Sequence, residues 1–299
     1  MTKGMFFGKV GRYVILIAVS SIMLYPLAFI ILGSLMPLDA YTNVTIIPIP
    51  NPITLGNYAG FFSRFHDGLW PALRITLLRV AWYVLLGLSV SLFGGYAFSR
   101  LRFPGKNMLF MFFLSGLAVP FILTSLPTYM MLARFPLVGG NNLQGLGGHG
   151  FIDEWPALFI LGWVDVFAVF LVKQSYDMLP VEYEEAARID GAGFFTIIFR
   201  VYVPMLRPAL VAVIVITSVA TWNDYFYPLL LVAGNRDLAP MALATQRAIY
   251  GMATGASLNS FPYPIVFSTA TIMSLPPLML YLFLQRYFVQ GLAATGVKG

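Results

Sequence analysis

Long uncharged stretches follow one another along the chain, separated by short segments that carry most of the charges. A helix needs about 20 mostly apolar residues to cross roughly 30 Å of hydrocarbon. The fourth stretch holds one acidic residue, Asp165, and the others are free of charge over most of their length. The pattern predicts an all-α polytopic membrane protein with six transmembrane helices, at about residues 13–36, 80–99, 108–131, 155–176, 208–230 and 264–285.

Composition supports a lipid environment. Hydrophobic residues make up 59% of the 299 residues and charged residues 10%, where a soluble domain carries roughly 25%. The net charge of +6 does not indicate nucleic-acid binding, because so apolar a chain offers no large basic face. Cysteine is absent and only His66 and His149 are histidines, which excludes disulfides and argues against metal sites built on thiolates or several imidazoles.

The first stretch has a basic start, as a signal peptide does, but its apolar run is much longer than the 7–15 residues of a signal-peptide core. We therefore expect an uncleaved anchor. This gives a short N-terminal segment at 1–12, a six-span domain at 13–285 and a tail at 286–299.

Basic residues indicate the orientation, since Lys and Arg gather on cytoplasmic loops. Of the 18 Lys and Arg residues, 12 fall on the termini and on alternate segments, which predicts that both termini are cytoplasmic. The other 6, among them Arg74, Arg79 and Arg134, are assigned to the outer side. A flexible glycine-rich loop, residues 139–150, is also expected outside.

The most informative segment is the longest predicted cytoplasmic loop, residues 177–207. Gly191 and Gly193 are suited to end a helix or to allow close approach of another backbone, and Pro204 stops the apolar piece that follows. The pattern predicts two short helices at a sharp glycine bend. An amphipathic helix lying on the membrane and a contact surface for another protein are both compatible with it. Carboxylates, which the helix dipole favours near a helix start, occupy the first turns: Glu182, Glu184 and Glu185.

The spacing in this segment resembles the EAA loop of ABC importer permeases. Glu185-Ala186-Ala187 is followed after three residues by Gly191, and after nine more by Val201, one residue and Val203-Pro204. Family members usually carry Ile and Leu at the two valine positions. We call residues 177–207 the EAA loop. Asp190-Gly191-Ala192 also resembles a step that is frequent in sugar importers.

Two further segments resemble carbohydrate permeases of this family. Trp222-Asn223-Asp224 follows the fifth span and is similar to their Trp-Asn-acid step. The ending, Gln290–Ala293 and Gly296–Gly299, is similar to the tail of the second permease of maltose-type systems.

The resemblance implies a permease subunit of an ATP-driven, binding-protein-dependent importer in the prokaryotic inner membrane, for a sugar or oligosaccharide, with an acidic saccharide as one possibility. Its partners would be a homologous second permease, two ABC ATPase subunits and an extracytoplasmic solute-binding protein. The chain itself would bind no cofactor, with ATP and Mg on the ATPases; Gly105-Lys106 lacks the rest of a phosphate-binding loop. The resemblance assigns ATPase coupling to Glu185, Ala186, Ala187, Asp190, Gly191 and Pro204.

A secondary transporter or channel for a small solute is the alternative, and such proteins rely on ionisable groups within the bilayer. Asp165 is the only such group evident near mid-span, and a structural role or solute contact would both explain it. A membrane enzyme is a third class, but paired carboxylates are not evident outside the EAA loop. Candidate residues for the solute pathway are Trp163, Asp165, Thr221, Trp222, Asn223 and Asp224.

Overall fold

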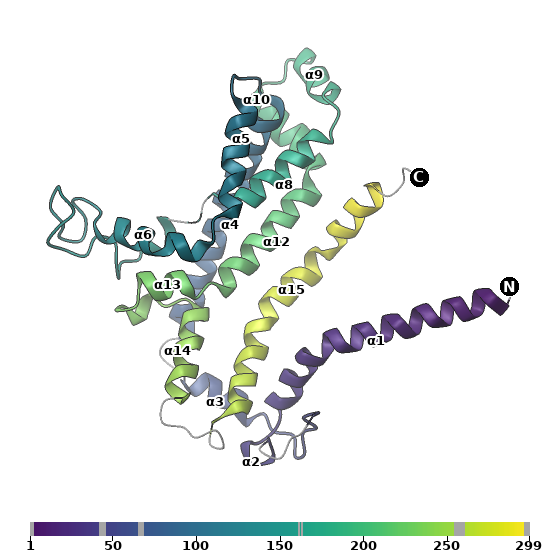
Figure 1. Ribbon diagram of the computed structural model, residues 1–299, viewed down its shortest axis with the longest axis vertical. Helices are drawn as coiled ribbons and strands as arrows, with labels where there is room; N and C mark the ends of the chain where they lie inside the picture. The colour runs from purple at the N-terminus through teal and green to yellow at the C-terminus, as the bar shows by residue number, and fades with distance from the viewer. Residues whose placement is uncertain are drawn as a thin grey trace. The chain divides into compact units, whose positions relative to one another are not determined.

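The computed structural model describes residues 3–41, 46–64, 69–160, 162, 164–253 and 261–295, which form helices joined by turns and contain no strand (Figure 1). The longest helices are α1 (Lys3–Ser34), α4 (Leu69–Arg100), α12 (Arg207–Asn223) and α15 (Tyr263–Thr295). Those of intermediate length are α3 (Gly56–Arg64), α5 (Lys106–Ser115), α6 (Phe121–Ala133), α8 (Val166–Asp177), α9 (Glu182–Ile189) and α14 (Met241–Ala253). The short elements are α2 (Leu38–Tyr41), η1 (Gly116–Ala118), α7 (Ala157–Ile160), α10 (Phe194–Thr196), the π-helix η2 (Ile197–Tyr202), α11 (Val203–Met205), α13 (Phe226–Leu231) and η3 (Arg236–Leu238).

Within these described ranges, three helices are long and apolar enough to cross a membrane alone, in α1 (Val10–Ser34), α4 and α15 (Tyr263–Gln285). Two further pairs qualify together but are sharply bent. Residues 106–118 meet α6 at 98°, and residues 194–205 meet α12 at 82°. The predicted all-helical membrane protein is confirmed at this level, with three to five candidate spans.

The fourth predicted span, residues 155–176, is interrupted. Helix α7 ends at Ile160, Gly162 has a φ of +88°, and α8 begins at Val166. Asp165 starts α8 as its N-cap: its Oδ1 accepts hydrogen bonds from the backbone N–H groups of Phe167 (2.8 Å) and Ala168 (3.3 Å). A capped start and a left-handed glycine explain why one continuous helix does not form here.

The second predicted span, residues 80–99, lies within α4, which starts earlier, at Leu69. Arg74 and Arg79, assigned to the outer side, therefore lie on the first turns of a continuous helix. Arg79 is buried, with 3% of its side chain exposed, and an ion pair described below compensates its charge.

The chain divides into two compact units, residues 1–67 with 245–276, and residues 68–244 with 277–299. In the first unit, Asn57 of α3 joins two other elements. Its Nδ2 donates to the backbone oxygens of Ser34 and Met36, both at 2.8 Å, and its own backbone oxygen accepts from Ser268 of α15 at 3.1 Å.

In the second unit, α4 packs against α8 and α12, and the three run side by side (Figure 1). Small residues one helical turn apart, Gly87, Ser91 and Gly95, give α4 a slim face. A Cβ at Gly95 would lie 3.0 Å from the backbone nitrogen of Lys173, so α8 crosses α4 in near-backbone contact.

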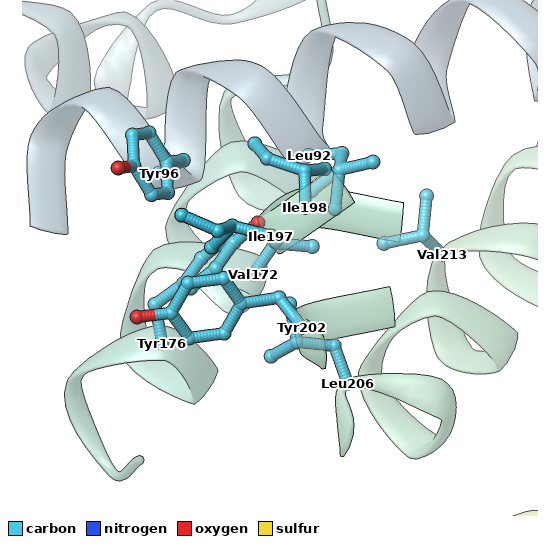
Figure 2. Close-up of a cluster of buried hydrophobic side chains, with 10 residues drawn as sticks. Leu92, Tyr96, Val172, Tyr176, Ile197, Ile198, Tyr202, Leu206 and Val213 are labelled. Carbon is cyan, nitrogen blue, oxygen red and sulfur yellow. The ribbon is translucent and has the colours of Figure 1, made fainter. Parts of the chain in front are cut away.

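Two groups of buried side chains form the core of the second unit. The first joins α4, α8, the EAA loop and α12, and Figure 2 labels most of its members: Leu92, Tyr96, Val172, Tyr176, Ile197, Ile198, Tyr202, Leu206 and Val213. The other lies among α6, α7 and α13 and the segment leading into α14: Leu132, Ala157, Leu158, Leu231, Val232, Ala239 and Leu243.

The glycine-rich loop at residues 139–150, expected to be flexible, is a series of hydrogen-bonded turns. Asn141 lies at its centre. The Nδ2 of Asn141 donates to the backbone oxygens of Ala133 (2.9 Å) and Phe135 (3.0 Å), and its Oδ1 accepts from the N–H of Gly148 (2.9 Å). One buried side chain therefore adds three hydrogen bonds to the backbone bonds of the turns.

Candidate functional site

Hydrogen bonds between the ends of α4 and α8 hold the start of the EAA loop in place. The Arg100 guanidinium donates to the backbone oxygens of Tyr176 (2.8 Å) and Leu179 (2.7 Å), which satisfies carbonyls at the end of α8. Asp177 accepts from Ser99 of α4 and from Lys173 one turn earlier, both at 2.6 Å. These hydrogen bonds fix the position at which the chain turns toward α9.

Helix α9 turns two adjacent carboxylates in opposite directions. Glu185, the predicted contact residue, is exposed, whereas Glu184 is buried with 5% of its area accessible. Glu184 Oε1 accepts from Tyr96 Oη and from Arg188 Nη2, each at 2.7 Å, and its Oε2 accepts from Tyr202 Oη at 2.7 Å. Burial alone raises the pKa of Glu184, but the hydrogen bonds from Tyr202, Arg188 and Tyr96 outweigh it and hold that pKa below its ordinary value.

The glycine bend is confirmed, and it closes α9 by a Schellman motif. Gly191 has a φ of +80°. Its N–H donates to Arg188 O (3.0 Å), and the N–H of Ala192 donates to Ala187 O (2.9 Å). Beyond its neighbours in sequence, a Cβ at Gly191 would meet no atom of the described residues within 4 Å, so a left-handed backbone, and not crowding by those residues, accounts for glycine here.

The predicted coupling residues form an exposed surface on α9 and the turn after it. Glu185, Ala186, Asp190 and Gly191 are exposed and Ala187 is half-buried. Ile189 joins them although no motif singled it out. It is 86% exposed, and it is the last residue of α9, which lies outside every candidate span.

Pro204 does not stop the helical path as expected. It lies in α11, which continues directly from the π-helix η2, and the chain bends at Leu206 instead, before α12. Pro204 is therefore some distance along the chain from the exposed surface of α9, and no described contact joins them.

Among the predicted pathway residues, Asp224 has a specific partner. Its Oδ2 accepts from Arg79 Nη2 of α4 at 2.6 Å. Arg79 Nε also donates to Leu158 O at 3.4 Å, an oxygen that accepts from Tyr83 Oη at 2.6 Å as well. The ion pair thus ties α4 to the end of α12 and to α7.

The other predicted pathway residues differ in burial and in hydrogen bonding. Thr221 and Trp222 are buried, and Asn223 is exposed and donates to Val219 O (3.0 Å). Asp165 caps α8, as described above, and Trp163 lies outside the described residues.

A cavity of about 1080 Å³ opens on α4 in the second unit, and none of the five described pathway residues lines it. Its walls are almost wholly apolar and rich in tryptophan: Trp70, Trp82, Trp155, Leu158 and Phe159, with Arg74 and Asp237 at the polar positions.

Sequence reasoning did not find the Glu184 network. Glu184 and Arg188 are four residues apart, which suggests an ordinary surface pair. Helical spacing was the one signal for the burial of Glu184. Glu184 and Ala187 are three residues apart and therefore share a face of α9, and that face is turned toward the core. Tyr96 and Tyr202 could not be matched to Glu184 without the fold. No three His, Cys, Asp or Glu residues in the described part of the chain are grouped so that they could hold a metal ion.

The chain belongs to the family of binding-protein-dependent transport system inner membrane components, whose model matches residues 87–294. This range includes the whole EAA loop, so the predicted resemblance to ABC importer permeases is confirmed.

Characterised relatives are similar over nearly the whole chain. The arabinooligosaccharides transport system permease protein AraQ of Halalkalibacterium halodurans is 29% identical, over 94% of this chain and 93% of its own length. The trehalose transport system permease protein SugB of Mycobacterium tuberculosis is 28% identical, over 92% and 93%. A crystal structure of a bacterial ABC transporter involved in import of the acidic polysaccharide alginate contains a chain of the same fold, with a TM-score of 0.75 and 21% identity, over 96% of this chain and 99% of that one.

Family membership settles several predictions. The chain is the multi-pass inner-membrane permease component and not the ATP-hydrolysing one, and permeases of this family bind no cofactor themselves. Dependence on a binding protein and on an ATPase follows from the same membership.

Proposed function

We propose that this chain forms part of the membrane passage of an ATP-driven saccharide importer, beside a homologous second permease and above two ABC ATPase subunits. The observation that carries the ATPase contact is the surface of α9. It exposes Ile189, Glu185 and the turn at Gly191 outside every candidate span. Ile189 is 86% exposed on this face, so an apolar contact with a partner would remove it from water.

The six-span topology belongs to the same proposal. Counting each bent pair as one span gives five, and α7 with α8 would supply the fourth span as a broken one. With both termini cytoplasmic, the loop at residues 139–150 is outside and α9 inside. Single cysteines in this cysteine-free chain test this: Leu143→Cys should react with an impermeant thiol reagent in intact cells, and Glu182→Cys only after lysis. The reverse pattern would invert the topology.

The saccharide assignment is supported by the relatives, which are named for arabinooligosaccharides and trehalose. The alginate transporter extends the range to acidic polysaccharides, and Arg74 of α4 lines the cavity on this helix. The chemistry common to these solutes is a polyhydroxylated ring.

Uptake of labelled arabinotriose, trehalose and alginate trisaccharide in host cells with and without the gene tests the proposal. We expect loss of uptake of at least one of them in the deletion strain, and uptake in the parent that is abolished by arsenate, which depletes ATP, yet resists a protonophore. Unchanged uptake of all three would remove the saccharide assignment. Sensitivity to the protonophore with ATP maintained would favour a secondary transporter.

A further inference from the structure

A buried carboxylate outside the candidate spans requires explanation, because removing a charge from water costs several kcal/mol unless hydrogen bonds compensate it. Glu184 receives that compensation from three elements: α4 through Tyr96, its own helix through Arg188, and η2 through Tyr202. Both carboxylate oxygens are engaged, and 5% of the residue is accessible. Glu184 is therefore poorly placed to meet a partner protein.

The two tyrosines are short, stiff connections. Their rings are in contact, with centroids 6.1 Å apart, and each also packs on Tyr176 of α8, at 5.8 Å for Tyr96 and 4.9 Å for Tyr202. Arg100 lies over the Tyr202 ring at 5.4 Å. Since these rings are buried among close-packed side chains, the hydroxyl groups that hold Glu184 have little freedom to follow it if α9 moves alone.

We infer that Glu184 is a positioning residue that makes α9 move together with the end of α4 and with η2, the element that leads into α12. This inference rests on the proposed function, in which α9 contacts the ATPase. The two adjacent glutamates then have separate tasks. Glu185 faces outward toward the partner, and Glu184 transmits the displacement of α9 to the spanning helices.

Tyr176 provides a matched control. Its hydroxyl lies in the same aromatic cluster and is buried, but it has no hydrogen-bond partner in the described structure. Tyr176→Phe removes an oxygen that holds nothing, whereas the double variant Tyr96→Phe/Tyr202→Phe removes two of the bonds to Glu184 and keeps every ring in place.

The test places one spin label at a time in the cysteine-free chain, at Glu182→Cys on α9 or at Arg102→Cys just after α4, both exposed positions. The permease is purified with its ATPases in lipid nanodiscs, and electron paramagnetic resonance spectra are compared without nucleotide and with Mg-ATP and vanadate. In the otherwise unchanged protein and in Tyr176→Phe, both labels should respond. In the double variant, the label on α9 should respond and the label after α4 should lose most of its response.

Equal responses of the Arg102→Cys label in the double variant and in Tyr176→Phe would overturn the inference. Loss of both responses in the double variant would also overturn it, because Glu184 would then serve the ATPase contact itself. No response at either position in the otherwise unchanged protein would instead contradict the proposed function. Should the double variant fail to reach the membrane, Glu184→Gln, which keeps the side-chain shape and removes the charge, is tested against the same control.

Discussion

Asp224 and Arg79, 145 residues apart in the sequence, form a 2.6 Å ion pair with 22% and 3% of their side chains exposed. The pair joins a predicted pathway residue, Asp224, to an arginine assigned to the outer side, and it connects α4 to the end of α12. Breaking such a pair leaves an uncompensated buried charge.

Replacing one partner should therefore destabilise the protein more than replacing both. We expect Asp224→Leu and Arg79→Met each to lower the free energy of unfolding by about 3 kcal/mol, and the double variant to recover most of the loss. Thermal unfolding of the purified protein in detergent, followed by circular dichroism, measures this. Equal losses that simply add in the double variant would refute the structural role of the pair.

Two neighbouring glycines of α4 should respond differently to alanine. A Cβ at Gly94 meets Val169 at 3.4 Å, an ordinary contact, so Gly94→Ala should be neutral or slightly stabilising through its helix propensity. A Cβ at Gly95 meets the Lys173 backbone and Val172 at 3.0 Å, so Gly95→Ala should cost about 1–3 kcal/mol. The same unfolding assay compares them, and equal stability of the two variants would show that α8 does not cross α4 this closely.

The sequence predicts features that depend on neighbouring residues, but it does not predict contacts between residues that lie far apart in the chain. The turn at Gly191 is local, set by a helix end and its glycine, and it was predicted correctly. The broken fourth span was missed because an apolar count does not register the left-handed turn at Gly162 or the capping role of Asp165. The burial of Arg79 was missed because its partner lies far away in the sequence. The inward orientation of Glu184 depends on Tyr96, 88 residues earlier, so the sequence alone explains Glu182, Glu184 and Glu185 only through the helix dipole.

Gly191 should tolerate asparagine better than valine. Its left-handed conformation costs a side-chain-bearing residue about 1–2 kcal/mol, most severely when the side chain is β-branched, and asparagine adopts it more readily. We expect Gly191→Val to raise amide hydrogen exchange in α9 and to weaken ATPase association, with Gly191→Asn close to the unchanged protein. If both variants lose ATPase association equally while α9 stays protected, close approach by the partner, and not φ, requires the glycine.

Stability should depend on the charge of Glu184 at acidic pH. The pKa of Glu184 is lowered in the folded state, so its stabilising contribution is complete above the ordinary value of about 4.3 and is lost as the pH falls through the lower folded value. The advantage of the unchanged protein over Glu184→Gln in melting temperature should be constant near neutral pH and shrink below about pH 4. An advantage that persists unchanged to the acid limit of folding would contradict a charged Glu184.

In the proposed importer, the ATPase docks on α9, and two equally simple substitutions test this. Ile189 on α9 and Leu143 in the loop at residues 139–150 are both strongly exposed, at 86% and 78%. Ile189→Asp should weaken ATPase binding by about 2 kcal/mol, roughly 30-fold, as loss of a buried interface anchor does, whereas Leu143→Asp should leave it unchanged. The measurement is the amount of ATPase subunit that co-purifies with each tagged variant from detergent-solubilised membranes. Loss in Ile189→Asp alone is the predicted result, and equal co-purification with both variants would contradict the account.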